Sequence, residues 1–181
     1  FTAVVVWLIL KWDEQADEEG SDRWLILIMY LMGLSIGVHL LNLLAIPAIA
    51  MVYYFRKYEF SWKGAFTAFI LSCVILAVVL YGIIPGFPTV AGWFELLFTN
   101  GFGCSFNTGL YVYLVLVAGL LGWGIWHTYR KLEQEYTQKM RWIHNGLVMV
   151  AVILIGYFSY AVTVIRSNAD TPMDQNSPDN V

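Results

Sequence analysis

The chain has 181 residues, of which 59% are hydrophobic and only 13% are charged, and its net charge is −3. A soluble domain of this size carries about twice that charged fraction. Several apolar runs reach about 18 residues, the length of a membrane-spanning helix, so the sequence predicts an all-α polytopic integral membrane protein. It has no basic face of the kind that nucleic-acid binding needs.

Residues 1–12 are apolar and predict the end of a truncated spanning helix. The next ten residues, 13–22, include six acidic ones and predict a solvated loop, because they lack the ligand order of a calcium-binding loop. The apolar start and the polar finish indicate an internal piece of a longer protein. We expect a transmembrane domain over 1–166 and a polar extracytoplasmic tail over 167–181 that leads to a further domain.

Residues 24–55 contain no charged side chain. A single helix of that length would measure about 48 Å, against about 30 Å for a hydrocarbon core, so two shorter helices joined by a hinge are the alternative. The two basic loops, 56–63 and 130–141, hold seven of the ten Lys and Arg residues and are expected to be cytoplasmic. Two helices put nine basic residues on that side and one long helix puts seven there, which favours the two-helix alternative.

The rest of the chain predicts three more spanning helices. Residues 64–84 run outward and end at Pro85-Gly-Phe-Pro88, where we expect a break, and residues 89–108 predict an outer loop with a short interfacial helix at 93–98. Residues 109–126 return, with close helix packing expected at Gly119, Gly122 and Gly124, and residues 142–165 cross again. With the short first helix and the hinged pair, this makes about six membrane segments. Loops 85–108 and 167–181 are then periplasmic.

One stretch, Gly33 to Met51, combines small residues, an imidazole, a carboxamide and a proline inside an apolar run. Gly33 and Gly37 lie one helical turn apart, which allows another backbone to approach. Pro47 disfavours a straight helix through residues 43–47. Polar side chains at membrane depth usually face a cavity or a partner, so His39 and Asn42 either contact a phosphate or sugar hydroxyl of a substrate or form an interhelical hydrogen bond at the hinge.

Three other positions are candidates for substrate binding. Trp93, Glu95 and Asn100 suit a sugar, since aromatic rings stack on sugar faces and carboxylates accept hydrogen bonds from hydroxyls; a water-facing Glu on an interfacial helix is the alternative. Arg166 either neutralises a lipid phosphate or snorkels at a helix end. The two cysteines, Cys73 and Cys104, are not expected to form a disulfide, and neither a metal site nor a cofactor is expected.

Two segments carry a family resemblance: Arg23-Trp24 with Gly33 to Pro47-Ala and Tyr53-Tyr-Phe-Arg-Lys57, and the closing stretch from Arg166 to Pro178. They resemble a bacterial family of polytopic membrane proteins that is grouped with protein O-mannosyltransferase-like enzymes of the GT-C class. The resemblance implies transfer of a mannose-like sugar from a polyprenyl-phosphate donor to Ser or Thr of an exported protein in the bacterial cytoplasmic membrane.

The resemblance also implies an acidic general base in the first extracytoplasmic loop, which lies outside these 181 residues, and a donor pocket faced by His39 and Asn42. Relatives of the wider class have a Lys near the hinge, where this chain has Leu43. A non-enzymatic membrane subunit of a cell-envelope complex is the alternative. A secondary transporter is disfavoured because the sequence contains no internal repeat.

Overall fold

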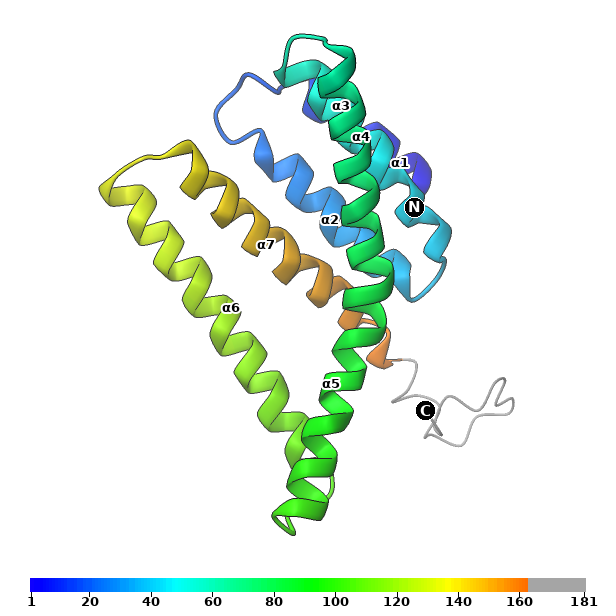
Figure 1. The fold of residues 1–181 in the computed structure, drawn as a ribbon, viewed down its shortest axis with the longest axis vertical. Coiled ribbons are helices and arrows are strands. Elements are labelled where there is room, and N and C mark those ends of the chain that lie inside the picture. Colours follow the sequence, from blue (N-terminus) through cyan, green and yellow to red (C-terminus); the bar gives the residue numbers. More distant parts are fainter. Residues whose placement is uncertain (163–181) are drawn as a thin grey trace. The chain divides into compact units, whose positions relative to one another are not determined.

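The computed structural model describes residues 1–162, and over that range its regular structure is helical (Figure 1). The helices, in chain order, are α1 (Thr2–Glu14), α2 (Asp22–Ile36), the short 3₁₀ helix η1 (Leu40–Leu44), α3 (Ala45–Lys57), α4 (Trp62–Ala77), the π-helical segment η2 (Val78–Ile83), α5 (Ile84–Leu96), the π-helical segment η3 (Leu97–Gly101), α6 (Thr108–Gln134) and α7 (Gln138–Phe158). The predicted all-α fold class is confirmed.

Four helical stretches in the described residues are long and apolar enough to cross a membrane: Leu40–Lys57, Trp62–Gly101, Thr108–Gln134 and Gln138–Phe158. Helices α1 and α2 are shorter, with 13 and 15 residues. The chain is therefore a polytopic membrane protein, and the prediction of a short helix before the hinge holds.

The chain forms two compact units. The first contains residues 1–59 together with the part of α7 from Val148 onward, and the second contains residues 60–147.

In the first unit, α1 packs against α2 and α3. Leu8 and Trp12 of α1 and Ile28 and Met32 of α2 are almost fully buried. The Trp12 ring stacks on Tyr53 of α3, with 5.2 Å between ring centroids. Burial of each such side chain contributes about 1.5–3 kcal/mol, so these contacts hold the three helices together.

The uncharged stretch 24–55 forms two helices, as the charge count favoured. Helix α2 ends at Ile36, the backbone is extended at His39 (φ −161°, ψ 105°), and the chain then turns through η1 into α3. Pro47 lies in the first turn of α3, where its missing N–H has no intrahelical partner to lose. The proline therefore marks the start of the second helix.

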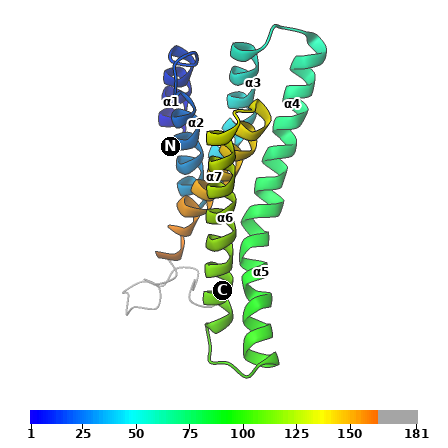
Figure 2. The same ribbon diagram turned by 90° about the vertical axis from the view of Figure 1, so that its left-hand side faces the viewer.

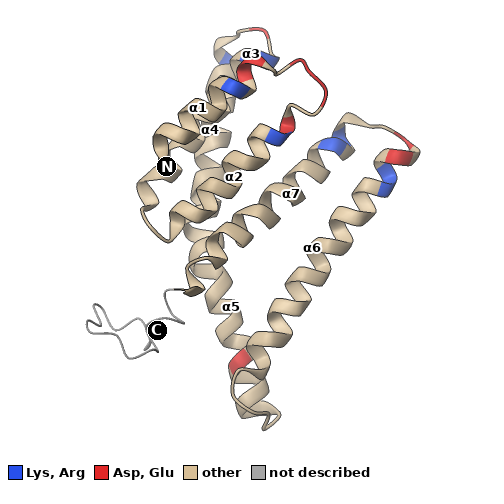
Figure 3. Cartoon of the chain, turned by 180° about the vertical axis from the view of Figure 1, so that it is seen from behind, with Lys and Arg blue, Asp and Glu red and all other residues tan. Residues whose placement is uncertain are grey.

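The acidic loop after α1 is partly exposed, but it is tied to the basic end of α3. Arg56 lies 2.6 Å from an Asp17 carboxylate oxygen and 3.5 Å from one of Asp13. Lys57 lies 3.4 Å from Asp17 and also donates to the carbonyl of Ala16. Figure 3 shows acidic and basic residues together at this end of the first unit. The loop is thus exposed to solvent but is also held to α3 by ion pairs, which the sequence did not predict.

In the second unit, the predicted helix break at residues 85–88 and outer loop over residues 89–108 are wrong. Helix α4, η2, α5 and η3 form one continuous helix from Trp62 to Gly101, so Pro85 and Pro88 do not break it, and only residues 102–107 form the connection to α6 (Figure 2). At about 1.5 Å per residue its 40 residues span about 60 Å, twice the hydrocarbon thickness.

The π-helical segment just before the prolines explains this continuity. A proline removes one backbone donor and its ring clashes with the carbonyl four residues earlier. Segment η2, Val78–Ile83, has the wider hydrogen-bond spacing of a π-helix and ends two residues before Pro85. Such local adjustments accommodate proline inside membrane helices without ending them.

Close packing in the second unit occurs at a glycine that the sequence analysis did not single out. A Cβ on Gly109 would lie about 2.5 Å from the Glu95 Cα, so α6 starts in direct contact with the backbone of α5. The expected packing at Gly119 and Gly122 is wrong for the described residues, since a Cβ at either position meets no atom within 4 Å. Gly124 makes only an ordinary contact with Leu147, 3.4 Å away.

Candidate functional site

The Gly33–Gly37 stripe packs against α7, as its spacing predicted. A Cβ on Gly33 would clash with the Ile153 carbonyl, and one on Gly156 would lie 2.7 Å from the Leu34 nitrogen. At Gly37, a Cβ would lie 3.3 Å from the Tyr160 ring. The two backbones meet at Gly33 and Gly156, so this face of α2 is an interhelical contact.

Asn42 is buried and makes hydrogen bonds with both ends of its carboxamide. Its nitrogen donates to the Ser35 hydroxyl at 3.1 Å and lies 3.4 Å from the Met32 sulfur. Its oxygen accepts a hydrogen bond of 2.9 Å from the Thr2 hydroxyl. The carboxamide thus connects α1, α2 and η1, which fits the alternative in which Asn42 holds the hinge.

His39 differs from Asn42 although the two are three residues apart. The His39 side chain is exposed, and its backbone N–H donates to the Ser35 carbonyl at 2.7 Å. Exposed apolar side chains at Val38, Leu40 and Leu41 surround it in sequence. The hinge therefore presents an imidazole on its outer side and holds the carboxamide within, so the described geometry leaves the imidazole free to meet a ligand.

Glu95 lies near the end of α5, and its side chain caps the start of α6. Its carboxylate accepts hydrogen bonds from the backbone N–H of Asn107 at 2.6 Å and of Leu110 at 3.0 Å, and from the Thr99 hydroxyl at 3.0 Å. A helix N-terminus carries unpaired N–H groups and a positive dipole end, both of which favour a carboxylate. Glu95 is thus a helix cap, and its carboxylate is not simply a water-facing group on an interfacial helix.

The cap needs an unusual backbone at Asn107. This residue precedes α6 with φ 70°, the left-handed region that Asn tolerates better than most residues. Its backbone N–H then donates a hydrogen bond to the Glu95 carboxylate. Sequence analysis missed this partner; the pair Asn107 and Gly109 at a helix start was the available signal.

Trp93 and Asn100 lie near Glu95 on the same continuous helix, and both side chains are exposed. Arg166 lies outside the described residues. The structure therefore groups the candidate residues in pairs or triples within units: His39 with Asn42 in the first, and Trp93 with Glu95 and Asn100 in the second. Substrate contact at these positions stays a prediction.

Residues that the sequence analysis did not select complete the site around Asn42. Thr2 and Ser35 provide its partners, and Gly156 provides the small residue opposite Gly33. Ser35 stands between the two glycines in the sequence, which was the available signal. Thr2 and Gly156 are distant in sequence, so only the packing of helices could bring them here.

Comparison with protein families finds one match. Residues 1–62 are similar to the family model described as "Protein O-mannosyl-transferase TMEM260 N-terminal domain". Neither a curated protein nor a solved structure matches the chain. The matched range contains α1, α2, η1 and α3, including the hinge with His39 and Asn42. The first third of this chain is thus similar to the N-terminal domain of a protein O-mannosyltransferase family.

Proposed function

We propose that the full-length protein is a membrane glycosyltransferase of the GT-C class, which transfers a mannose-like sugar from a polyprenyl-phosphate donor to Ser or Thr of exported proteins. The observation that carries the proposal is the match of residues 1–62 to an O-mannosyltransferase N-terminal domain. The match ends just after α3 and includes the hinge. A bacterial cytoplasmic membrane, as the resemblance of the Gly33–Pro47 stretch implies, is part of the same proposal.

The two polar residues of the hinge have different roles in this proposal. His39 contacts the donor, because its imidazole is exposed and can donate a hydrogen bond to a phosphate oxygen. Asn42 acts indirectly, because its carboxamide is committed to Thr2 and Ser35 and fixes the segment that presents His39. Trp93, Glu95 and Asn100 contact the acceptor or the sugar; for Glu95, such contact has to coexist with its role as the cap of α6.

A transfer assay tests the proposal. Full-length protein in membranes is supplied with a polyprenyl-phosphate-linked sugar and a Ser/Thr-rich acceptor peptide, and His39→Ala is compared with Leu41→Ala at equal protein level. Leu41 is an exposed residue of the same hinge segment and serves as the matched control. Loss of a hydrogen bond to a charged phosphate is worth about 1.5–3 kcal/mol, so His39→Ala is expected to transfer about tenfold or more slowly.

Two results would count against the proposal in different ways. Equal transfer by His39→Ala, Leu41→Ala and wild type would remove His39 from the donor site but keep the enzyme. Absence of transfer by the wild type with every polyprenyl-phosphate sugar supplied would favour the non-enzymatic subunit of an envelope complex.

A further inference from the structure

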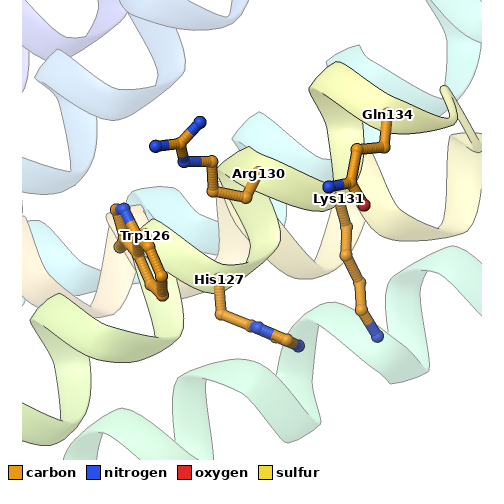
Figure 4. Close-up of a pocket in the computed structure, with 5 residues that line it drawn as sticks. All are labelled: Trp126, His127, Arg130, Lys131 and Gln134. Carbon is orange, nitrogen blue, oxygen red and sulfur yellow. The ribbon is translucent and has the colours of Figure 1, made fainter.

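The end of α6 carries a pocket at the opposite end of that helix from the Glu95 cap. The pocket has a volume of about 380 Å³ and is lined by five α6 residues: Trp126, His127, Arg130, Lys131 and Gln134 (Figure 4). It combines two permanent positive charges with an aromatic ring. No residue of it was selected from the sequence, and nothing in the proposed function uses it.

Helical spacing explains the form of the pocket. Trp126, Arg130 and Gln134 follow one another at intervals of four, and His127 and Lys131 form a second row beside them. Such rows are ridges on a helix, and the space between two ridges is a groove. Figure 4 shows His127 and Lys131 pointing to the same side of the helix.

Aromatic rings hold the polar groups of the pocket in place. The Arg130 guanidinium lies 5.8 Å from the centroid of the Trp126 ring, a cation–π distance. The His127 ring stacks on Trp123, with 5.3 Å between centroids and 13° between planes. The Arg130 guanidinium therefore lies over one exposed ring, and the His127 ring is stacked on another.

The charges of the pocket are only partly neutralised by the protein. Arg130 lies 3.7 Å from the Glu133 carboxylate, an exposed contact that leaves the remaining guanidinium N–H groups available. The Lys131 ammonium has no hydrogen bond or ion pair within residues 1–162. Residues 130–141 contain four basic and two acidic side chains, so the local charge is positive.

The pocket also lies where a membrane surface is expected. Its five residues occupy the last third of Thr108–Gln134, a candidate membrane span, and Lys139 and Arg141 follow in the first turn of α7. Trp123, Trp126 and Tyr129 are all more than half exposed. Trp and Tyr collect at the headgroup level of a bilayer, and basic side chains beside them attract anionic lipids.

We propose that this groove binds the phosphate headgroup of an anionic phospholipid. Lys131 provides a point charge, Arg130 donates hydrogen bonds to phosphate oxygens, and the Trp126 ring covers the glycerol and the first acyl carbons. A soluble phosphate would use the two cations but not the exposed rings. Two cations and exposed rings on neighbouring ridges at the end of a span therefore favour a lipid over a free phosphate.

The test uses the full-length protein in lipid nanodiscs. Discs of phosphatidylcholine alone are compared with discs that also contain phosphatidylglycerol, and the phosphatidylglycerol retained after gentle delipidation is counted by native mass spectrometry. Arg130→Gln and Lys131→Gln, alone and together, are the test variants. Lys139→Gln removes one charge from the first turn of α7, outside the pocket, and is the matched control.

A basic side chain that contacts the lipid phosphate contributes about fivefold to binding, so the single variants should lose about fivefold in apparent affinity and the double variant about twenty-five-fold. Lys139 does not line the pocket, so Lys139→Gln should stay close to wild type. Added glycerol phosphate should leave the retained lipid unchanged. Equal losses in Lys139→Gln and Lys131→Gln would overturn the proposal, because the effect would then be that of net charge. Displacement of the lipid by glycerol phosphate would overturn the lipid assignment in favour of a free phosphate site.

Discussion

The Asn42 carboxamide shows what a polar side chain does inside the first unit. It joins Thr2 of α1 and Ser35 of α2 to η1, so removing it leaves two hydroxyl groups without that partner. The Ser35 hydroxyl keeps its hydrogen bond to the Met32 carbonyl and Thr2 is exposed, so the cost is that of the two lost hydrogen bonds, about 0.5–1.5 kcal/mol each. A carboxamide in this position therefore stabilises the hinge whether or not a substrate binds there.

We expect Asn42→Ala to destabilise the protein by about 1–3 kcal/mol, seen as a lower midpoint of thermal unfolding in detergent. Asn100→Ala is the control, because Asn100 is an exposed amide at the end of a helix. A midpoint for Asn42→Ala that equals that of Asn100→Ala would show that the hydrogen bonds of Asn42 contribute nothing to stability.

Glycines of the same chain should respond to alanine in opposite directions. Gly33→Ala places a methyl group against the Ile153 carbonyl, which cannot move without separating α2 from α7. Gly119→Ala enters open space inside α6, where Ala is favoured over Gly by about 1 kcal/mol. The midpoint of thermal unfolding should fall for Gly33→Ala and stay or rise for Gly119→Ala. A fall of equal size in both variants would contradict the close contact between Gly33 and the backbone of α7.

At the scale of elements, Glu95 connects the end of one helix to the start of the next. Its carboxylate replaces the missing intrahelical partners of the Asn107 and Leu110 N–H groups. Gly109 allows this approach, because any side chain there would strike the α5 backbone. The turn between the two helices is thus fixed by one acid and one glycine.

We expect Glu95→Gln to weaken the cap, because it removes the charge that favours the dipole end, and Glu95→Ala to weaken it further, by about 1 kcal/mol. Hydrogen exchange of the Leu110 amide should accelerate in the order wild type, Gln, Ala. The Thr99→Val variant keeps both backbone bonds and is the control. Unchanged exchange in Glu95→Ala would show that the cap does not protect α6.

The continuous helix from Trp62 to Gly101 is the element that sequence analysis described least well. Two prolines and a glycine within four residues favoured a break, but the π-helical segment ahead of them absorbs the change in hydrogen bonding. Whether a proline ends a helix depends on the residues before it, and the wider turn of a π-helix leaves no periodic pattern in the sequence.

At the scale of the whole molecule, the membrane arrangement follows from helices and charges. The acidic loop 13–22 lies with the basic end of α3 in the first unit, as the ion pairs of Asp17 show. The hinge, residues 37–44, lies at the other end of α2. If α2 crosses the membrane, the loop and the hinge face opposite sides.

This arrangement is tested by labelling single cysteines in a Cys-free background, in which Cys73 and Cys104 are replaced. Gly20→Cys and Tyr58→Cys should react with a membrane-impermeant reagent from the same side, and Leu41→Cys from the opposite side. Labelling of all three from one side would show that α2 and α3 enter and leave the membrane on the same face.

Composition and hydrophobic run length determined the membrane class and the all-α fold, because these depend on how much apolar surface a segment carries, and the distribution of basic residues favoured the two-helix form of residues 24–55. The sequence also indicated the close contact at Gly33, since small residues one helical turn apart allow another backbone to approach closely. Tertiary structure decided which backbone fills that contact, that Asn42 faces inward while His39 faces out, and that Glu95 caps α6. Those outcomes depend on residues such as Thr2, Gly156 and Asn107, whose contributions exist only once distant helices have met.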